Sequence, residues 1–332
     1  MTLGLRNGLK MNDILQYRKF KKYLFLIIGF ILIYFISSLI NIDENKIVNI
    51  FRKLNYIHLS IAISLYLISH FVRVLRLVLL SPKKNSNLLG LVKEQYKANG
   101  VSILLPFKLG ESYRLIYFRT FFGSYSNSFS VLLSERLLDL LIIFLILSTS
   151  LLFSPLDIPN IDYIFFGSLL LLIFLGLIYF SIEVISSIFI NFFTKKEANN
   201  LNTIALNIST NLLQSSKSIK KILNQKFIAC LSITFLIWSL EISAFFIFFE
   251  ILNARIDLLI LLAIAVSLSS LLPNGPLGYG GIQLAFYTIG SAINNSELIY
   301  YSFVYSVCFF GSGLIVACTL FIYDFFMINT ND

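Results

Sequence analysis

Long apolar segments separated by short polar connections make up most of the chain. Six of these segments are predicted to be spans, and most of them reach the roughly 20 residues that a helix needs to cross a bilayer. The pattern predicts an all-α polytopic membrane protein. The predicted spans are Tyr23–Ile40, Ile57–Leu80, Asn127–Phe153, Tyr163–Phe193, Phe227–Leu252 and Leu298–Met327.

Two further apolar stretches, Ala98–Phe118 and Leu258–Ile293, are broken by proline and glycine. Proline removes a backbone donor and glycine weakens a helix, so neither stretch is expected to be one continuous helix. In hydrocarbon, the freed backbone groups are tolerated only against protein or water. We predict two re-entrant helical hairpins, the kind of element that often builds a transporter's binding site. The expected break residues are Pro106 and Gly110 in the first, and Pro273, Gly275, Pro276, Gly278, Gly280 and Gly281 in the second.

Lysine and arginine in the connections predict the orientation, because cytoplasmic loops carry an excess of both. The N-terminus and the connection over residues 194–226 are basic, whereas 154–162 has two aspartates and no basic residue. Both termini are therefore expected in the cytoplasm. The chain is expected to be a multi-pass protein of the cell (plasma or inner) membrane. The loop Asn41–Tyr56 runs against the rule, but the inside loops are more basic. Apolar residues at helical spacing within 194–226 predict a helix at the inner interface.

The predicted topology divides a single transmembrane domain, residues 1–332, into two similar halves. These are residues 23–153 and 163–327, and they would insert with opposite orientation. Leu104-Leu105-Pro106 followed by Leu109-Gly110 resembles Leu271-Leu272-Pro273 followed by Leu277-Gly278. We therefore expect inverted repeats whose hairpins enter from opposite faces and meet near the midplane.

Composition narrows the function classes. Hydrophobic residues make up 57% of the chain and charged residues 13%, about half the share in soluble domains. The net charge of +9 lies in short connections rather than on one face, so we expect no nucleic-acid partner. We find no metal-binding or nucleotide-binding motif, and expect no cofactor and no enzyme activity.

Charged residues within the apolar segments are functional candidates, because burying a charge in a membrane is costly. The eight candidates named at the end of this paragraph comprise five cations and three anions. The surplus of positive charge suits the phosphate of an anionic lipid headgroup. The alternative is an internally neutralised network that only fixes helix register. Glu241, deeper in the fifth span, is a separate candidate for carrying a proton. The predicted headgroup-binding residues here are Arg73, Arg76, Lys108, Glu111, Arg114, Glu135, Arg136 and Asp139.

Near the second break, Asn274, Tyr279 and Gln283 are candidates to hydrogen-bond a headgroup. The alternative is that they only satisfy backbone groups freed by the break.

The motifs described above resemble those of the flippase-like transmembrane family, also called the lysylphosphatidylglycerol synthase transmembrane region. The matching pieces are Arg73 and Arg76, Leu105 to Arg114, Glu135-Arg136 with Asp139, and Pro273 with Gly278 and Gly281. The resemblance implies movement of lipids or lipid-linked sugars between leaflets. Some members carry a soluble aminoacyl-transferring domain; we expect no such domain here, and therefore do not expect this chain to make lysyl lipid by itself. Gln283 stands near a position where the family commonly has glutamate, which puts ion coupling or headgroup choice in doubt.

The leading functional prediction is a translocator of an anionic phospholipid or lipid-linked sugar. One alternative is an intramembrane transferase that uses Glu111, Glu135 and Asp139 as acid or base; another is a membrane scaffold for envelope lipid synthesis. The expected partners are a membrane lipid or lipid-linked sugar, with a homo-oligomer or envelope-synthesis enzymes as further candidates.

Overall fold

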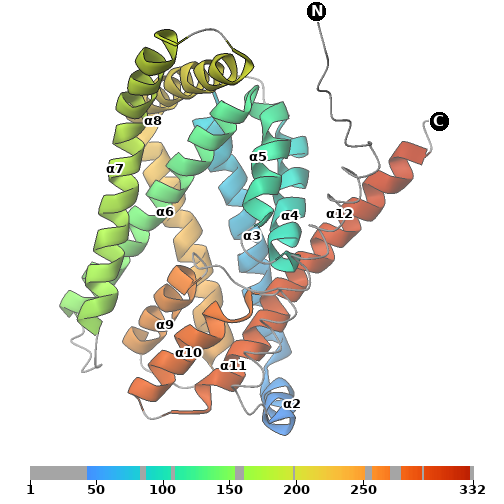
Figure 1. Cartoon of the computed structure of the whole chain (residues 1–332). Helices are drawn as coiled ribbons and strands as arrows, with labels where there is room; N and C mark the ends of the chain where they lie inside the picture. The colour runs from blue at the N-terminus through green and yellow to red at the C-terminus, as the bar shows by residue number, and fades with distance from the viewer. Residues whose placement is uncertain are drawn as a thin grey trace, which may run out of the picture.

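The computed structural model of this chain describes residues 43–82, 87–105, 109–153, 161–196, 199–250, 256–269, 278–293 and 295–329, and every element in these ranges is a helix (Figure 1). The predicted first span, Tyr23–Ile40, lies outside the described residues. So do Pro106, Lys108, Pro273, Asn274, Gly275 and Pro276. The helices are α2 (Glu44–Lys53), α3 (Tyr56–Leu80), α4 (Leu88–Leu104), α5 (Leu109–Phe122), α6 (Tyr125–Phe153), α7 (Ile161–Thr194), α8 (Asn200–Phe249), α9 (Ile256–Ser269), α10 (Gly281–Ala292), α11 (Leu298–Tyr305), the π-helical turn η3 (Ser306–Phe310) and α12 (Gly311–Asn329).

Four described helical segments are long and apolar enough to cross a membrane: Tyr56–Leu80, Leu172–Thr194, Leu201–Phe249 and Leu298–Phe326. The prediction of an all-α transmembrane protein is confirmed, whereas the count of six spans and the inverted repeats stay predictions. The surface of α7 agrees with a lipid-facing helix, because a long row of its apolar side chains is exposed. These include Phe166, Leu170, Ile173, Phe174, Leu177, Phe180, Val184 and Ile188.

The first broken stretch forms two helices, α4 and α5, that pack against each other. A Cβ on Gly110 would lie 1.8 Å from Ser102 Oγ, so glycine lets the two helices approach closely. α4 begins at Leu88, well before the predicted Ala98, and Asn87 caps it by accepting from the Gly90 N–H at 3.0 Å. The polar residues before Ala98 indicated a loop because they are charged, but tertiary contacts bury part of them.

The second broken stretch also forms two helices, α9 and α10, that pack together. Figure 1 shows α4 and α5 in the upper half of the bundle and α9 and α10 in the lower half.

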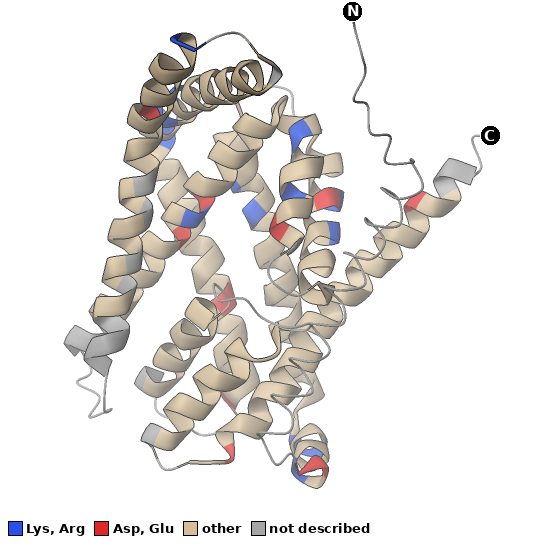
Figure 2. Cartoon of the chain, viewed as in Figure 1, with Lys and Arg blue, Asp and Glu red and all other residues tan. Residues whose placement is uncertain are grey.

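α8 contains both the predicted interfacial helix and the predicted fifth span. Lys226, with φ −120° and ψ 18°, interrupts its helical backbone at the predicted boundary. Figure 1 shows the first part of α8 lying across the top of the bundle, at a steep angle to the second part. Lysine and arginine are also found at this end, near the junction of α7 and α8 (Figure 2).

The predicted last span is divided by the π-helical turn Ser306–Phe310 between α11 and α12. Such turns arise inside α-helices and are frequent at functional sites. Here Tyr305, which precedes the turn, and Phe310, its last residue, both line the central cavity.

Two buried apolar clusters hold the bundle together. One joins parts of α3, α4, α5, α6 and α8, and the other joins parts of α2, α3, α6, α8, α9, α10, α11 and η3. α3 takes part in both: Ala62 and Tyr66 belong to the second cluster, and Val74 and Leu77 to the first. Arg73 follows Tyr66 by two helical turns and therefore lies where the two clusters meet.

The contact between α4 and α12 depends on Gly100, whose added Cβ would lie 2.1 Å from Ala317 Cβ. We expect Gly100→Ala to force the helices apart and to lower the free energy of unfolding by about 1–3 kcal/mol. Gly176→Ala is the matched control, because the described structure places no atom within 4 Å of its added Cβ. Thermal unfolding in detergent measures both. Equal midpoints for the two variants would contradict the close contact, and Ala317→Gly is expected to rescue Gly100→Ala.

Candidate functional site

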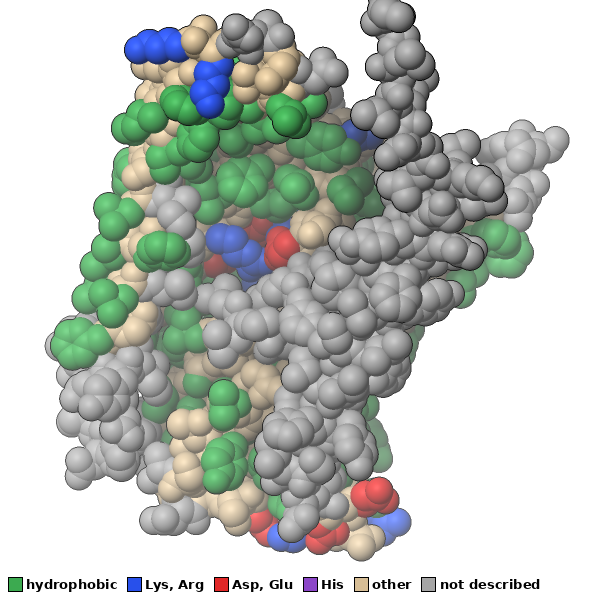
Figure 3. Space-filling view, in the orientation of Figure 1, with side chains coloured by type: hydrophobic (Ala, Val, Ile, Leu, Met, Phe, Trp, Pro, Cys, Tyr) green, Lys and Arg blue, Asp and Glu red, His purple; other side chains and the backbone are tan. Residues whose placement is uncertain are grey.

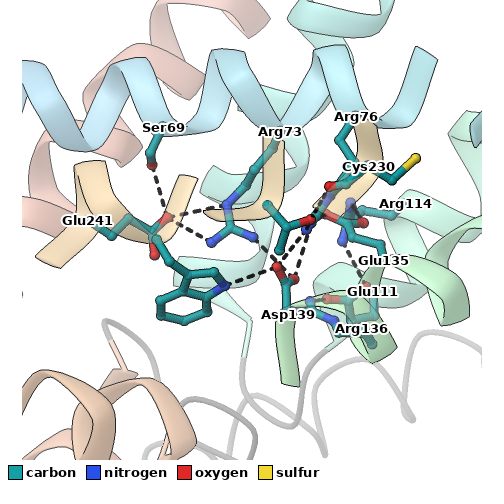
Figure 4. Close-up of polar contacts among 12 residues, drawn as sticks. Ser69, Arg73, Arg76, Glu111, Arg114, Glu135, Arg136, Asp139, Cys230 and Glu241 are labelled. Atoms are coloured by element: carbon teal, nitrogen blue, oxygen red, sulfur yellow. Dashed lines mark hydrogen bonds and ion pairs between the residues drawn. The ribbon is translucent and has the colours of Figure 1, made fainter. Parts of the chain in front are cut away.

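Four arginines and four carboxylates from α3, α5, α6 and α8 lie in contact at the centre of the bundle (Figure 4). Seven of the eight were predicted to gather, and Glu241 was expected to act separately. Helical spacing places them in pairs: Arg73 with Arg76, Glu111 with Arg114, and Glu135 with Asp139 are three or four residues apart and share a face.

Arg76 is the central member of the network and is fully buried. Its Nη1 donates to Asp139 Oδ1 at 2.7 Å and to Thr234 Oγ1 at 3.0 Å. Its Nη2 donates to Glu135 Oε1 at 2.8 Å. The planar guanidinium thus joins two carboxylates of α6, a geometry that a lysine cannot reproduce.

Arg73 extends the network toward α8. Its Nη2 donates to Glu241 Oε1 at 2.7 Å, and its Nη1 donates to Asp139 Oδ2 at 3.4 Å. Ser69 Oγ donates to the same Glu241 oxygen at 2.9 Å. Trp238 Nε1 donates to Asp139 Oδ1 at 3.2 Å.

Arg114 extends the network in the other direction, toward α5. Its Nη2 donates to Glu135 Oε2 at 2.5 Å, and its Nη1 donates to Glu111 Oε2 at 3.3 Å. Arg136 donates to the other oxygen of Glu111. Acid and base therefore alternate along one line, which we call the ion-pair chain: Glu241, Arg73, Asp139, Arg76, Glu135, Arg114, Glu111 and Arg136.

The ion-pair chain corrects the charge count made from the sequence. That count set five cations against three anions and left Glu241 out. Among the described residues, four arginines face four carboxylates, because Glu241 belongs to the network. Lys108, the fifth cation, lies outside the described residues. The described part of the site is neutral overall, as the alternative of an internally neutralised network requires.

A cavity of about 260 Å³ lies beside the ion-pair chain. Ser102 and Leu105 of the first hairpin line it, and so do Ser267 and Gly278 of the second. Arg76 is buried behind this lining, whereas the Arg136 and Glu111 side chains at one end of the chain are 34% and 33% exposed. Figure 3 shows charged side chains of both signs in a hollow of one face, framed by hydrophobic side chains.

Tyr279 and Gln283 do not line this cavity. Gln283 Oε1 accepts from the Gly280 N–H at 2.8 Å and so caps α10, which is the alternative considered for it. The Tyr279 ring lies 5.7 Å from that of Phe303. Gly278 and Gly280 have φ of 70° and 102°, a conformation that glycine adopts without strain.

Several cavity residues carried no binding assignment in the sequence. They are uncharged side chains, among them Tyr66, His70, Gln95, Asn99, Trp238 and Tyr305. Helical spacing could have identified them, because polar residues recur on one helix face in two places. These are Tyr66, His70 and Arg73, and Gln95, Asn99 and Ser102. They were missed because only charged residues were sought within the spans.

Comparison with known proteins identifies a family but no individual relative. No curated protein and no solved structure matches this chain. The family described as "Lysylphosphatidylglycerol synthase TM region" matches residues 24–317, nearly the whole chain. This chain therefore belongs to the lysylphosphatidylglycerol synthase TM region family.

Proposed function

We propose that the protein is a lipid translocator, which carries the headgroup of an anionic phospholipid or lipid-linked sugar through the central cavity. The observation that carries the proposal is a polar cavity in the middle of an apolar bundle, lined by both hairpins. The family match supports a role connected with lipids. The lysine-rich end near the junction of α7 and α8 would face the cytoplasm.

The size of the cavity suits a headgroup rather than a whole lipid. Its volume of about 260 Å³ is just below the roughly 300–1,000 Å³ of small-molecule pockets. The acyl or prenyl tails would stay in the bilayer, beside the exposed apolar side chains that frame the hollow in Figure 3.

The exposed end of the ion-pair chain offers a way to admit a phosphate. Arg136 is paired with Glu111 alone among the described residues, and both side chains are about one-third exposed. A phosphate would take the place of Glu111 on Arg136, and Glu111 would keep its contact with Arg114, whose Nη1 lies 3.3 Å away. Because each inner arginine contacts two carboxylates, small changes of partner along the chain would accompany headgroup passage.

The transferase alternative receives less support. Glu111, Glu135 and Asp139 each accept hydrogen bonds from arginines. None of them is placed as a free acid or base. The proposed role therefore includes no bond-making step.

The test is a leaflet-resolved transfer assay with the purified full chain in liposomes. Fluorescent phosphatidylglycerol in the inner leaflet should become accessible to an impermeant quencher faster than in protein-free vesicles. Conversion of a labelled lipid-linked sugar into a new product, without transfer, would instead support the transferase. If neither transfer nor conversion is observed, the scaffold role remains.

A further inference from the structure

The central cavity has a second wall, opposite in character to the ion-pair chain. It is formed by α3 and α4 and consists of Tyr66, His70, Gln95 and Asn99, which we call the neutral wall. Tyr66 and His70 are four residues apart, as are Gln95 and Asn99, so each pair lies on one helical face.

The neutral wall has hydrogen-bonding groups without a partner. His70 is 8% exposed and Gln95 5%. Within the part of the chain that the structure describes, neither ring nitrogen of His70 has a hydrogen-bond partner, and neither has Gln95 Oε1. The His70 ring contacts that of Tyr66 edge-on at 4.8 Å, and Asn99 Nδ2 reaches the Tyr66 hydroxyl only at 3.5 Å.

Such groups are costly to bury, since an unsatisfied donor or acceptor loses its hydration without replacement. The carboxylates of the ion-pair chain are paired with its arginines, among whose buried nitrogens only Arg76 Nε and Arg114 Nε lack a partner in the described residues, whereas both ring nitrogens of His70 in the neutral wall lack one. Two side chains that line the cavity, His70 and Gln95, therefore have spare hydrogen-bonding capacity, on both donor and acceptor atoms.

We propose that the neutral wall binds the hydroxyl groups of the lipid headgroup, as a glycerol or a sugar would supply them. A neutral imidazole offers one donor and one acceptor, and the Gln95 oxygen is an acceptor. A hydroxyl both donates and accepts, so it matches this set. A phosphate only accepts, an ammonium only donates, and choline does neither at its charged end. The inference rests on the proposed function and specifies the headgroup that the same cavity takes.

Trp238 provides the readout, because it is the only tryptophan in the chain and lines this cavity. Its fluorescence would be followed in phosphatidylcholine nanodiscs with increasing amounts of a test lipid. Phosphatidylglycerol and phosphatidylmethanol carry the same charge, but only the first has free headgroup hydroxyls. Monoglucosyldiacylglycerol supplies hydroxyls without charge and separates a sugar source from a glycerol phosphate source.

We expect phosphatidylglycerol to bind about three- to tenfold more tightly than phosphatidylmethanol, the effect of one or two hydrogen bonds. His70→Phe and Gln95→Leu should remove this preference. The matched controls are His58→Phe and Gln214→Leu, which change the same residue types outside the cavity. Both cavity variants should keep or raise the thermal unfolding midpoint, because each replaces an unpartnered buried polar group by an apolar one of similar size.

Equal binding of the two phospholipids by the wild type would overturn the inference, as would an unchanged preference in both cavity variants. Other outcomes would contradict the proposed function without contradicting this inference, or the reverse. If binding depends on His70 and Gln95 but no lipid changes leaflet, the site stands and translocation does not. If lipids are transferred without regard to hydroxyls, translocation stands and the neutral wall is not its binding site.

Discussion

Replacing Arg76 by methionine is expected to lower the free energy of unfolding by about 3–5 kcal/mol, the usual cost of leaving a buried charge without its partner. Arg76 is fully buried and bonds both Glu135 and Asp139. Without it, the two carboxylates of α6 would face three remaining arginines through longer contacts. Thermal unfolding in detergent, or the yield of folded protein in size-exclusion chromatography, would show the loss.

A second substitution makes this prediction specific. Adding Asp139→Asn to Arg76→Met leaves three complete ion pairs: Arg73 with Glu241, Arg114 with Glu135, and Arg136 with Glu111. The asparagine oxygen can still accept from Trp238. The double variant should therefore be clearly more stable than the single variant. Arg52→Met, at the exposed end of α2, is the control and should be nearly neutral. A double variant no better than the single one would show that the order of charges along the ion-pair chain does not determine stability.

Replacing Arg136 by glutamine is expected to slow headgroup transfer by about 10- to 100-fold, the effect of losing a charged hydrogen bond to phosphate. The stability cost should stay within about 1 kcal/mol, because its ion pair with Glu111 is partly exposed. Arg136→Lys should restore only part of the rate, since an ammonium lacks the planar fork of the guanidinium. The leaflet-resolved assay measures all three proteins.

Two further variants separate substrate binding from charge balance. Arg119→Gln removes a charge on α5 outside the cavity and should leave transfer unchanged. Combining Arg136→Gln with Glu111→Gln restores neutrality. If Arg136 binds the headgroup, this double variant stays slow. Recovery of the rate would mean that the network only fixes helix register, and that headgroup binding lies elsewhere.

Much of the architecture can be predicted from hydropathy, because crossing a bilayer imposes a length and an apolar composition on each helix. The structure places α3 and α7 within a few residues of their predicted spans. Both Pro/Gly breaks separate pairs of packed helices, and Lys226 divides α8 near the predicted boundary. Helical spacing also identified which charges share a face, as with Arg73 and Arg76.

The partners of these charges depended on tertiary structure. Glu241 lies far from Arg73 along the chain, so no local pattern could place it in the network or show that the four arginines are balanced. The beginning of α4 was missed for a related reason. Lys97 indicated a solvated loop, but it is buried and paired with Glu94 and with Asp324 of α12.

The sequence by itself determined that the chain is a helical membrane protein with two apolar stretches broken by proline and glycine, and with ionisable residues inside apolar segments. These properties follow from local composition and from the cost of burying free backbone groups and charges. Only the tertiary structure decided that the charges alternate in one neutral line and that a neutral wall of polar side chains faces the same cavity. Both depend on which helix faces meet, and packing between residues distant in sequence sets those contacts.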